Sequence, residues 1–199
     1  MDRLRILLAS QNAHKARELE AALPGASVEL LAGVAFPDET GATFYENARA
    51  KAELGRAHAP PGLWAAGEDS GLEVDGLGGR PGIRSARFAG EGASDEANVD
   101  LLLAELADVS GDGRRGRYVC ELVVLSPDGD EVRGSGALAG RIARAPRGSG
   151  GFGYDPVFVP DGEAKSVAEL GDEWKARHSH RARAALALAL ALGRGAEPL

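Results

Sequence analysis

The order of strand-like and helix-like segments is the feature of this sequence that most constrains its fold. Leu4–Ala9 is a short apolar run typical of a buried strand, and a helical pattern follows it up to Leu23. Tyr118–Leu125 is the clearest strand, and Pro127-Asp128-Gly129 predicts a turn into a partner strand from Glu131 to about Ala139. Strands that alternate with helices, followed by a hairpin, predict an α/β fold with a mixed sheet.

Two capping boxes predict where further helices begin. Thr43 and Glu46 have capping-box spacing ahead of a helix from Phe44 to about Ala57, and Ser166 with Glu169 repeats the pattern. The other predicted elements are short strands at Leu63–Ala66 and Pro156–Val159, a helix capped by Asp95 that runs through Leu106 with Ala97, Leu101 and Leu102 on its buried side, and an alanine- and leucine-rich helix that begins near Ser179–His180.

The length and composition are typical of a soluble globular protein. The 199 residues suffice for one domain, residues 1–199, or for two lobes that share one core. The net charge of −7 argues against a nucleic-acid polymer as the partner, although a small anionic ligand can bind where basic residues gather. We therefore expect a single domain with a small-molecule ligand.

Three features favour the cytoplasm. Cys120 is the only cysteine and lies in an apolar run, which indicates a reducing compartment and a structural role. The N-terminus lacks the pattern of a signal peptide. The longest apolar run, Ala184–Leu192, is about half of what a bilayer crossing needs. We expect a cytoplasmic protein that has no contact with a membrane.

A polar segment, Ser10-Gln11-Asn12-Ala13-His14-Lys15, joins the first predicted strand to the first predicted helix. Backbone N–H groups at a helix N-terminus favour phosphate, and Lys15 adds a cation. The glycine spacing of a Walker A loop is absent. Taken alone, the segment is equally typical of a solvated turn.

The helix that follows Thr43 carries a polar face. Thr43, Asn47 and Lys51 are spaced by four residues and share that face, whereas Phe44, Ala48 and Ala52 form the neighbouring apolar face. Glu39 precedes the helix, where its carboxylate can point at the same site as Lys51. A surface salt bridge is the alternative explanation.

Adjacent acids follow the short strand at Leu63–Ala66, in the sequence Glu68-Asp69-Ser70-Gly71. Carboxylates at a strand end are the usual ligands of Mg²⁺, which keeps some of its waters and binds substrate phosphates. A carboxylate there can also accept a proton from an attacking water. An Asp-Ser-Gly turn is the alternative.

Two late segments are candidates for binding a base. Gly150-Gly151-Phe152-Gly153-Tyr154-Asp155-Pro156 places aromatic rings among glycines, where a ring can stack on a base, although packing in the core also explains them. Lys175, with Ser179-His180-Arg181, gathers hydrogen-bond donors near the start of the last helix. A solvated helix end is the alternative for these donors.

These five segments, in this order, resemble the inosine triphosphate pyrophosphatase family, also called HAM1-like. The resemblance extends from about Leu7 to Leu188. The stretch from Gly71 to Gly82, with Ser85-Ala86-Arg87, is similar to the long signature that follows the family's acidic pair. Gln11, Glu68 and Trp174 differ from the family's usual glycine, aspartate and acidic residue.

The resemblance implies a fold, an activity and roles for residues. It implies an elongated mixed β-sheet flanked by helices, two lobes with a central nucleotide cleft, and a homodimer. It also implies Mg²⁺-dependent hydrolysis of ITP, dITP and XTP to the monophosphate and pyrophosphate. The implied roles are phosphate binding by Ser10, Gln11, Asn12, Ala13, His14 and Lys15, metal binding by Glu39 and Asp69, proton acceptance by Asp69, substrate contact by Ser70, and base binding by Phe152, Gly153, Tyr154, Asp155, Lys175, His180 and Arg181.

For the activity that the resemblance implies, we expect an electrostatic mechanism. Mg²⁺ with Lys15 and Lys51 neutralises the triphosphate and the departing pyrophosphate, while Asp69 orients or deprotonates a water aimed at the α-phosphorus. Two alternatives remain. One is a related pyrophosphatase for modified pyrimidine triphosphates, against which the Phe152 loop and Arg181 argue. The other is a non-catalytic nucleotide-binding protein, for which loss of Glu39, Asp69 or Lys15 would be expected.

Overall fold

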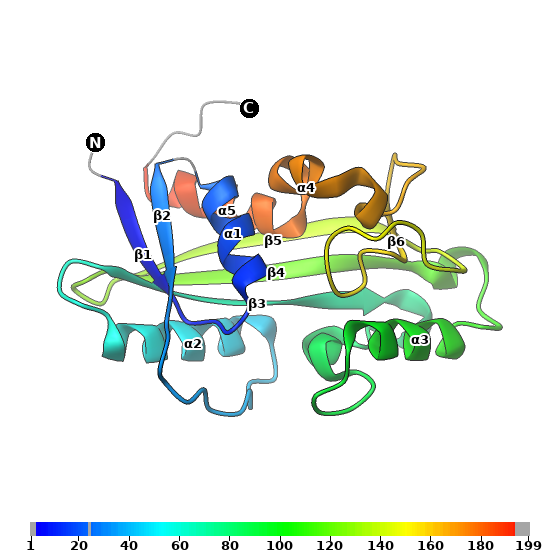
Figure 1. The fold of residues 1–199 in the computed structure, drawn as a ribbon, viewed down its shortest axis with the longest axis horizontal. Coiled ribbons are helices and arrows are strands. Elements are labelled where there is room, and N and C mark those ends of the chain that lie inside the picture. The colour runs from blue at the N-terminus through cyan, green and yellow to red at the C-terminus, as the bar shows by residue number, and fades with distance from the viewer. Residues whose placement is uncertain (1–2, 24, 194–199) are drawn as a thin grey trace. The chain divides into compact units, whose positions relative to one another are not determined.

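The structure is a computed structural model that describes residues 3–23 and 25–193. Its sheet has six strands in the order β2-β1-β3-β4-β5-β6 (Figure 1). β1 pairs in parallel with β2 and with β3, whereas β5 and β6 are antiparallel, so the prediction of a mixed sheet is confirmed. The strands are β1 (Leu4–Leu8), β2 (Ala26–Leu30), β3 (Trp64–Val74), β4 (Arg115–Leu125), β5 (Glu131–Ile142) and β6 (Phe158–Pro160).

Five α-helices and three short 3₁₀ helices accompany the strands in the described part of the chain. The α-helices are α1 (Ala13–Ala22), α2 (Phe44–His58), α3 (Asp95–Glu105), α4 (Val167–His178) and α5 (His180–Ala191). The 3₁₀ helices are η1 (Asp75–Leu77), η2 (Gly82–Arg87) and η3 (Gly111–Arg114). Within residues 3–23 and 25–193, no helix combines the length and apolar character that a membrane crossing needs.

The chain divides into two compact units. The first contains Met1–Asp69, Cys120–Gly136 and His180–Leu199, and the second contains Ser70–Val119 and Ala137–Ser179. β3, β4 and β5 each include a point at which the chain passes from one unit to the other.

In the first unit, helices cover both faces of the strands. α1 and α5 pack on one face, and α2 packs on the other (Figure 1). Gly67 on β3 permits the close approach of α2, because a Cβ there would lie 2.0 Å from the carbonyl oxygen of Ala48. Gly136 on β5 does the same for α5, since a Cβ would lie 2.1 Å from the carbonyl oxygen of His180. These glycines bring helix-borne side chains close to the strands.

The second unit has its own apolar core. α3 contributes Val99 and Leu102 to it, and the strands contribute Leu72, Tyr118 and Phe158 among others. The Tyr118 and Phe158 rings lie 4.6 Å apart between centroids in a tilted arrangement.

Local signals located the helix starts well, with one correction. Both predicted capping boxes are present, at Thr43 with Glu46 and at Ser166 with Glu169. The prediction that Asp95 caps α3 is wrong, because the hydroxyl of Ser94 accepts the hydrogen bond from the backbone N–H of Ala97. Ala97, predicted to be buried, is exposed, and Leu101 is only half-buried. The buried residues of α3 are Asn98, Val99 and Leu102.

Two strands differ from the prediction. β2 was not predicted, because its burial is only partial and Glu29 is exposed, so apolar alternation is weak. β3 was predicted to be short and to end before the acidic pair, yet it runs through Glu68 and Asp69 to Val74. Buried carboxylates need a neutralising partner, and the partners described below allow the strand to continue.

Candidate active site

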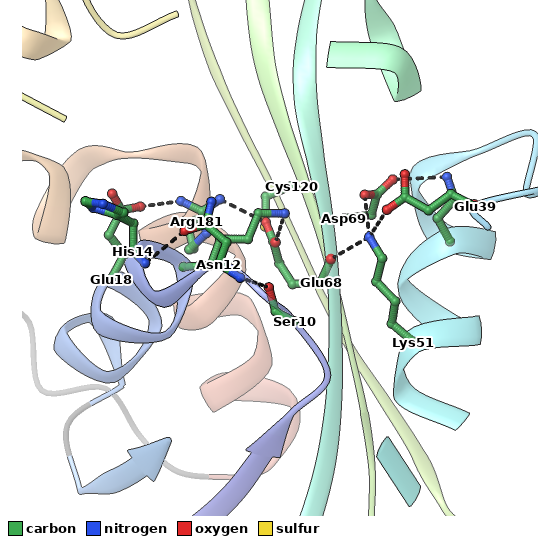
Figure 2. A network of polar contacts seen from close by, with 12 residues as sticks. Ser10, Asn12, His14, Glu18, Glu39, Lys51, Glu68, Asp69, Cys120 and Arg181 are labelled. Atoms are coloured by element: carbon green, nitrogen blue, oxygen red, sulfur yellow. Dashed lines mark hydrogen bonds and ion pairs between the residues drawn. The ribbon is translucent and has the colours of Figure 1, made fainter. Parts of the chain in front are cut away.

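Glu68 and Asp69 are neighbours on β3 and are both buried. Successive side chains of a strand point to opposite faces. Glu68 therefore points toward α1 and α5, and Asp69 points toward α2 (Figure 2). The acidic pair supplies two separate charged clusters, both within the first unit.

Asp69 is held by the polar face of α2. Lys51 Nζ lies 2.9 Å from Oδ1 of Asp69, and Asn47 Nδ2 donates a hydrogen bond of 3.2 Å to Oδ2. The same ammonium forms an ion pair with Glu39 and donates to the backbone carbonyl of Glu68 at 3.3 Å. The predicted meeting of Glu39 with Lys51 is confirmed. Asn47, four residues before Lys51 on the same face of the helix, belongs to the same cluster.

Burial and charge shift both pKa values in this cluster. Burial raises the pKa of the Asp69 carboxyl above its usual value, although the attraction of Lys51 opposes the shift. Burial alone would lower the pKa of Lys51, but the charges of Asp69 and Glu39 outweigh it and raise that pKa. Lys51 is therefore held as a cation beside a carboxylate that accepts a proton more readily than an exposed one.

Glu68 is held by cations from two helices. Its Oε2 lies 2.6 Å from Nζ of Lys15, and its Oε1 accepts a hydrogen bond of 3.0 Å from Arg181. The thiol of Cys120 also contacts Oε1, at 3.3 Å. Arg181 forms a further ion pair with Glu18 of α1. The side chains of Glu68 and Arg181 are both only 2% exposed. Removing either one would therefore destabilise the fold, because the other would be left as a buried charge with one partner fewer.

The predicted phosphate segment forms the N-terminus of α1. Asn12 is the N-cap, and its side chain accepts from the backbone N–H of His14 at 2.9 Å. Ser10 Oγ accepts from the backbone N–H of Asn12 at 3.1 Å. Gln11 is exposed, and Ala13 is the first helical residue and is also exposed. The segment thus has the helix-terminal geometry that favours a phosphate group.

A third cluster lies within the second unit and is centred on Asp155. Its carboxylate accepts from Lys175 Nζ at 2.8 Å, from the Tyr118 hydroxyl at 3.2 Å and from the backbone N–H of Phe152 at 3.0 Å. The ammonium of Lys175 lies 4.7 Å from the centre of the Phe152 ring. Tyr154 is buried in the core of this unit, where its hydroxyl donates to the Ser85 carbonyl at 2.8 Å.

The structure thus distributes the predicted residues between the two units. The first unit contains Ser10–Lys15, Glu39, Lys51, Asp69, His180 and Arg181, and the second contains Ser70, Phe152, Gly153, Tyr154, Asp155 and Lys175. His180 begins α5 and is buried. Within the described residues, no group of three or more His, Cys, Asp and Glu side chains is arranged to hold a metal ion by itself.

Sequence reasoning missed two contacts of these clusters and the division of the acidic pair between two sets of partners. Glu18 pairs with Arg181. The sequence feature that could have indicated this role was the position of Glu18 three residues after Lys15 on a predicted helix. Cys120 was predicted to be structural, and its contact with Glu68 joins positions far apart in the sequence. Glu68 was singled out with Asp69, but no pattern indicated that the two would have different partners.

The fold and these clusters define an α/β protein whose charged centre is built on an acidic pair within a central strand. The model of the Ham1 family matches residues 6–191, and the chain therefore belongs to the Ham1 family.

Named relatives and solved structures agree with this membership. A dITP/XTP pyrophosphatase of Streptomyces avermitilis is 47% identical over 185 residues, which cover 89% of this chain and 91% of that protein. The Ham1 protein of Staphylococcus aureus has a TM-score of 0.81 and 38% identity, with 96% of this chain and 100% of that chain covered. A nucleoside-triphosphatase and dITP/XTP pyrophosphatase of Mycobacterium abscessus has a TM-score of 0.71 and 42% identity, with 93% and 97% covered.

Proposed function

We propose that this protein is an enzyme that hydrolyses non-canonical purine nucleoside triphosphates, namely ITP, dITP and XTP, to the monophosphate and pyrophosphate. The observation that carries the proposal is the placement of Lys15 and Lys51 against the acidic pair of β3, at 2.6 Å from Glu68 and 2.9 Å from Asp69. Two ammonium groups and two carboxylates suit a polyanion that is bound with a metal ion. The names of the relatives support the choice of dITP and XTP.

Mg²⁺ is the proposed metal, with Glu39 and Asp69 as its ligands. Both carboxylates contact the single ammonium of Lys51, so they lie close enough to serve one cation. Carboxylate oxygens are the ligands that Mg²⁺ prefers, and two protein ligands suit an ion that keeps its waters and binds substrate phosphates. When bound, the ion would neutralise charge on the triphosphate.

The remaining steps fall to the chain's own residues. Ser10–Lys15 binds phosphate through the N-terminus of α1, and Lys15 and Lys51 offset the charge of the departing pyrophosphate. Asp69 accepts the proton of the water that attacks the α-phosphorus, a role that its raised pKa suits. Ser70 contacts the substrate beside it.

The base would be recognised by donors that face its 6-oxo group. Arg181 and His180 are the proposed donors, with Lys175 in support. Phe152 stacks on the ring, and Gly153, Tyr154 and Asp155 shape its surroundings. The ammonium of Lys175 donates to Asp155 and lies over the ring of Phe152. These two contacts support a role for Lys175 as a donor with a fixed position.

We further propose that residues 1–199 act as a single nucleoside triphosphate pyrophosphatase domain. The active protein would be a cytoplasmic homodimer without a nucleic-acid polymer or a membrane as partner. Light scattering at micromolar concentration tests the dimer, and a monomer mass would reject it.

Pyrophosphate release from a panel of triphosphates, with and without Mg²⁺, tests the activity. We expect release from ITP, dITP and XTP, little from ATP, and none without the metal. A preference for modified pyrimidine triphosphates would favour the related pyrophosphatase. Binding of ITP without any turnover would favour the nucleotide-binding protein.

A further inference from the structure

Glu68 belongs to a series of four alternating charges in the first unit. Its carboxylate contacts Lys15 Nζ at 2.6 Å through Oε2 and Arg181 Nη2 at 3.0 Å through Oε1. Arg181 in turn pairs with Glu18, which lies on α1 three residues after Lys15. The series therefore begins and ends on α1 and passes through β3 and α5, and Figure 2 shows its members Glu68, Arg181 and Glu18.

Burial differs along this series. The side chains of Glu68 and Arg181 are 2% exposed, whereas those of Lys15 and Glu18 are 17% exposed. Lys15 is therefore more accessible to a phosphate than Glu68 is. A buried carboxylate is costly unless it is neutralised, and two cations from different helices neutralise Glu68.

The carboxylate of Glu68 is also fixed in rotation. The thiol of Cys120, on the neighbouring strand β4, contacts the same Oε1 that accepts from Arg181. With Oε1 held by Cys120 and Arg181, Oε2 remains directed at Lys15. One carboxylate, contacted on Oε1 by two partners, thus reaches both cations.

We propose that Glu68 is a positioning residue that links Lys15 to Arg181, and so couples phosphate binding to recognition of the base. The inference rests on the proposed function, in which Lys15 contacts the phosphates and Arg181 the base. A phosphate that takes up the charge of Lys15 leaves Arg181 as the cationic partner of Glu68. Such a coupling acts equally in both directions.

Glu68→Gln tests the coupling, because it removes the charge and keeps the shape. We expect kcat/KM for ITP to fall more than that for ATP, so that the ITP-to-ATP preference shrinks by roughly 5-fold or more. The affinity of the metal-free protein for inorganic tripolyphosphate, measured by calorimetry, should rise, since an anion beside Lys15 is lost. A purely structural residue would not tighten one property while it weakened the other.

Two further variants complete the test. Glu68→Asp keeps the charge and should restore part of the preference with tripolyphosphate affinity near wild type. Glu121→Gln is the matched control, because Glu121 lies in the same unit and holds Arg133 and Ser135 on the surface. It should change neither property.

The outcomes separate this inference from the proposed function. An unchanged preference in Glu68→Gln, or equal losses on ITP and ATP, would overturn the coupling. If wild-type protein releases no pyrophosphate from ITP, the proposed function fails instead. The calorimetric measurement still applies in that case, and unchanged tripolyphosphate affinity in Glu68→Gln would reject the link between Glu68 and Lys15.

Discussion

Lys51 Nζ lies 2.9 Å from Oδ1 of Asp69 and also donates to the backbone carbonyl of Glu68, the residue before it. One ammonium from α2 therefore contacts both members of the acidic pair, although their side chains point to opposite faces of β3. The side chain of Asp69 is available for chemistry on the α2 face, and that of Glu68 is engaged with α1 and α5.

Asp69→Asn should abolish most turnover in a folded protein. The change removes a proposed proton acceptor, whose loss typically costs roughly 10²–10⁴-fold in rate, and it removes a proposed metal ligand as well. The measurement is kcat for ITP at saturating Mg²⁺. A value near that of the wild type would disprove the assignment of Asp69.

The same variant should be no less stable than the wild type at neutral pH. Burial raises the pKa of Asp69, so the folded protein binds this proton more tightly than the unfolded chain does. The contribution of Asp69 to stability is therefore present below its unfolded pKa and is lost as the pH rises through its folded pKa. In thermal unfolding with EDTA, the Tm of Asp69→Asn should equal or exceed that of the wild type at pH 7. The difference between the two Tm values should disappear as the pH is lowered. The control is Asp100→Asn on the exposed side of α3.

Lys15→Ala should reduce turnover of every triphosphate, with a change in the ITP-to-ATP preference that is small beside the loss of rate. Lys15 lies at the N-terminal end of α1, where its ammonium can follow charge onto the leaving pyrophosphate. The measurement is kcat/KM for ITP and ATP, and Lys165→Ala, at an exposed position, is the control. A shift in the ITP-to-ATP ratio with little change in rate would mean that Lys15 recognises the base.

Arg181→Ala should lower kcat/KM for ITP steeply and for ATP only slightly, because donors facing a 6-oxo group are left unpaired by adenine. The burial of Arg181 adds a cost in stability of about 3–5 kcal/mol, since Glu18 and Glu68 lose their shared cation. Arg181→Lys keeps the charge but not the planar fork, so it should retain more stability while the ITP preference still shrinks. Denaturant unfolding and kcat/KM for both substrates measure the two effects. Equal fractional losses on ITP and ATP would assign Arg181 to the phosphates or the fold.

Cys120 should not react with thiol reagents in the native protein. Burial, with the negative charge of Glu68 next in importance, raises the pKa of this thiol well above its usual value. The thiolate is the form that attacks such reagents, and here it is scarce and shielded. After an aromatic disulfide is added, the absorbance of the released aromatic thiolate should show no reaction in buffer. In denaturant it should show one equivalent per protein chain. Rapid labelling of the native protein would contradict the buried position.

The sequence by itself determined the features that depend on neighbouring residues. The capping boxes at Thr43 and Ser166 and the strand β1 rest on short-range spacing, which repeats in any helix or strand. The meeting of Glu39 with Lys51, expected because Glu39 lies just ahead of the helix that carries Lys51, was confirmed. The family resemblance, carried by five ordered motifs, was confirmed by the match over residues 6–191.

Only the tertiary structure decided the partners of Glu68 and Asp69. The contact between Glu68 and Arg181 spans 113 positions, and no local pattern predicts it. The length of β3 depended on the same contacts, because a strand can carry two acids through its buried middle only where cations from α1, α2 and α5 reach them. An isolated charge is costly to bury, so a buried carboxylate is tolerated only where the fold places a cation or a hydrogen-bond donor beside it. Such partners come from distant parts of the sequence.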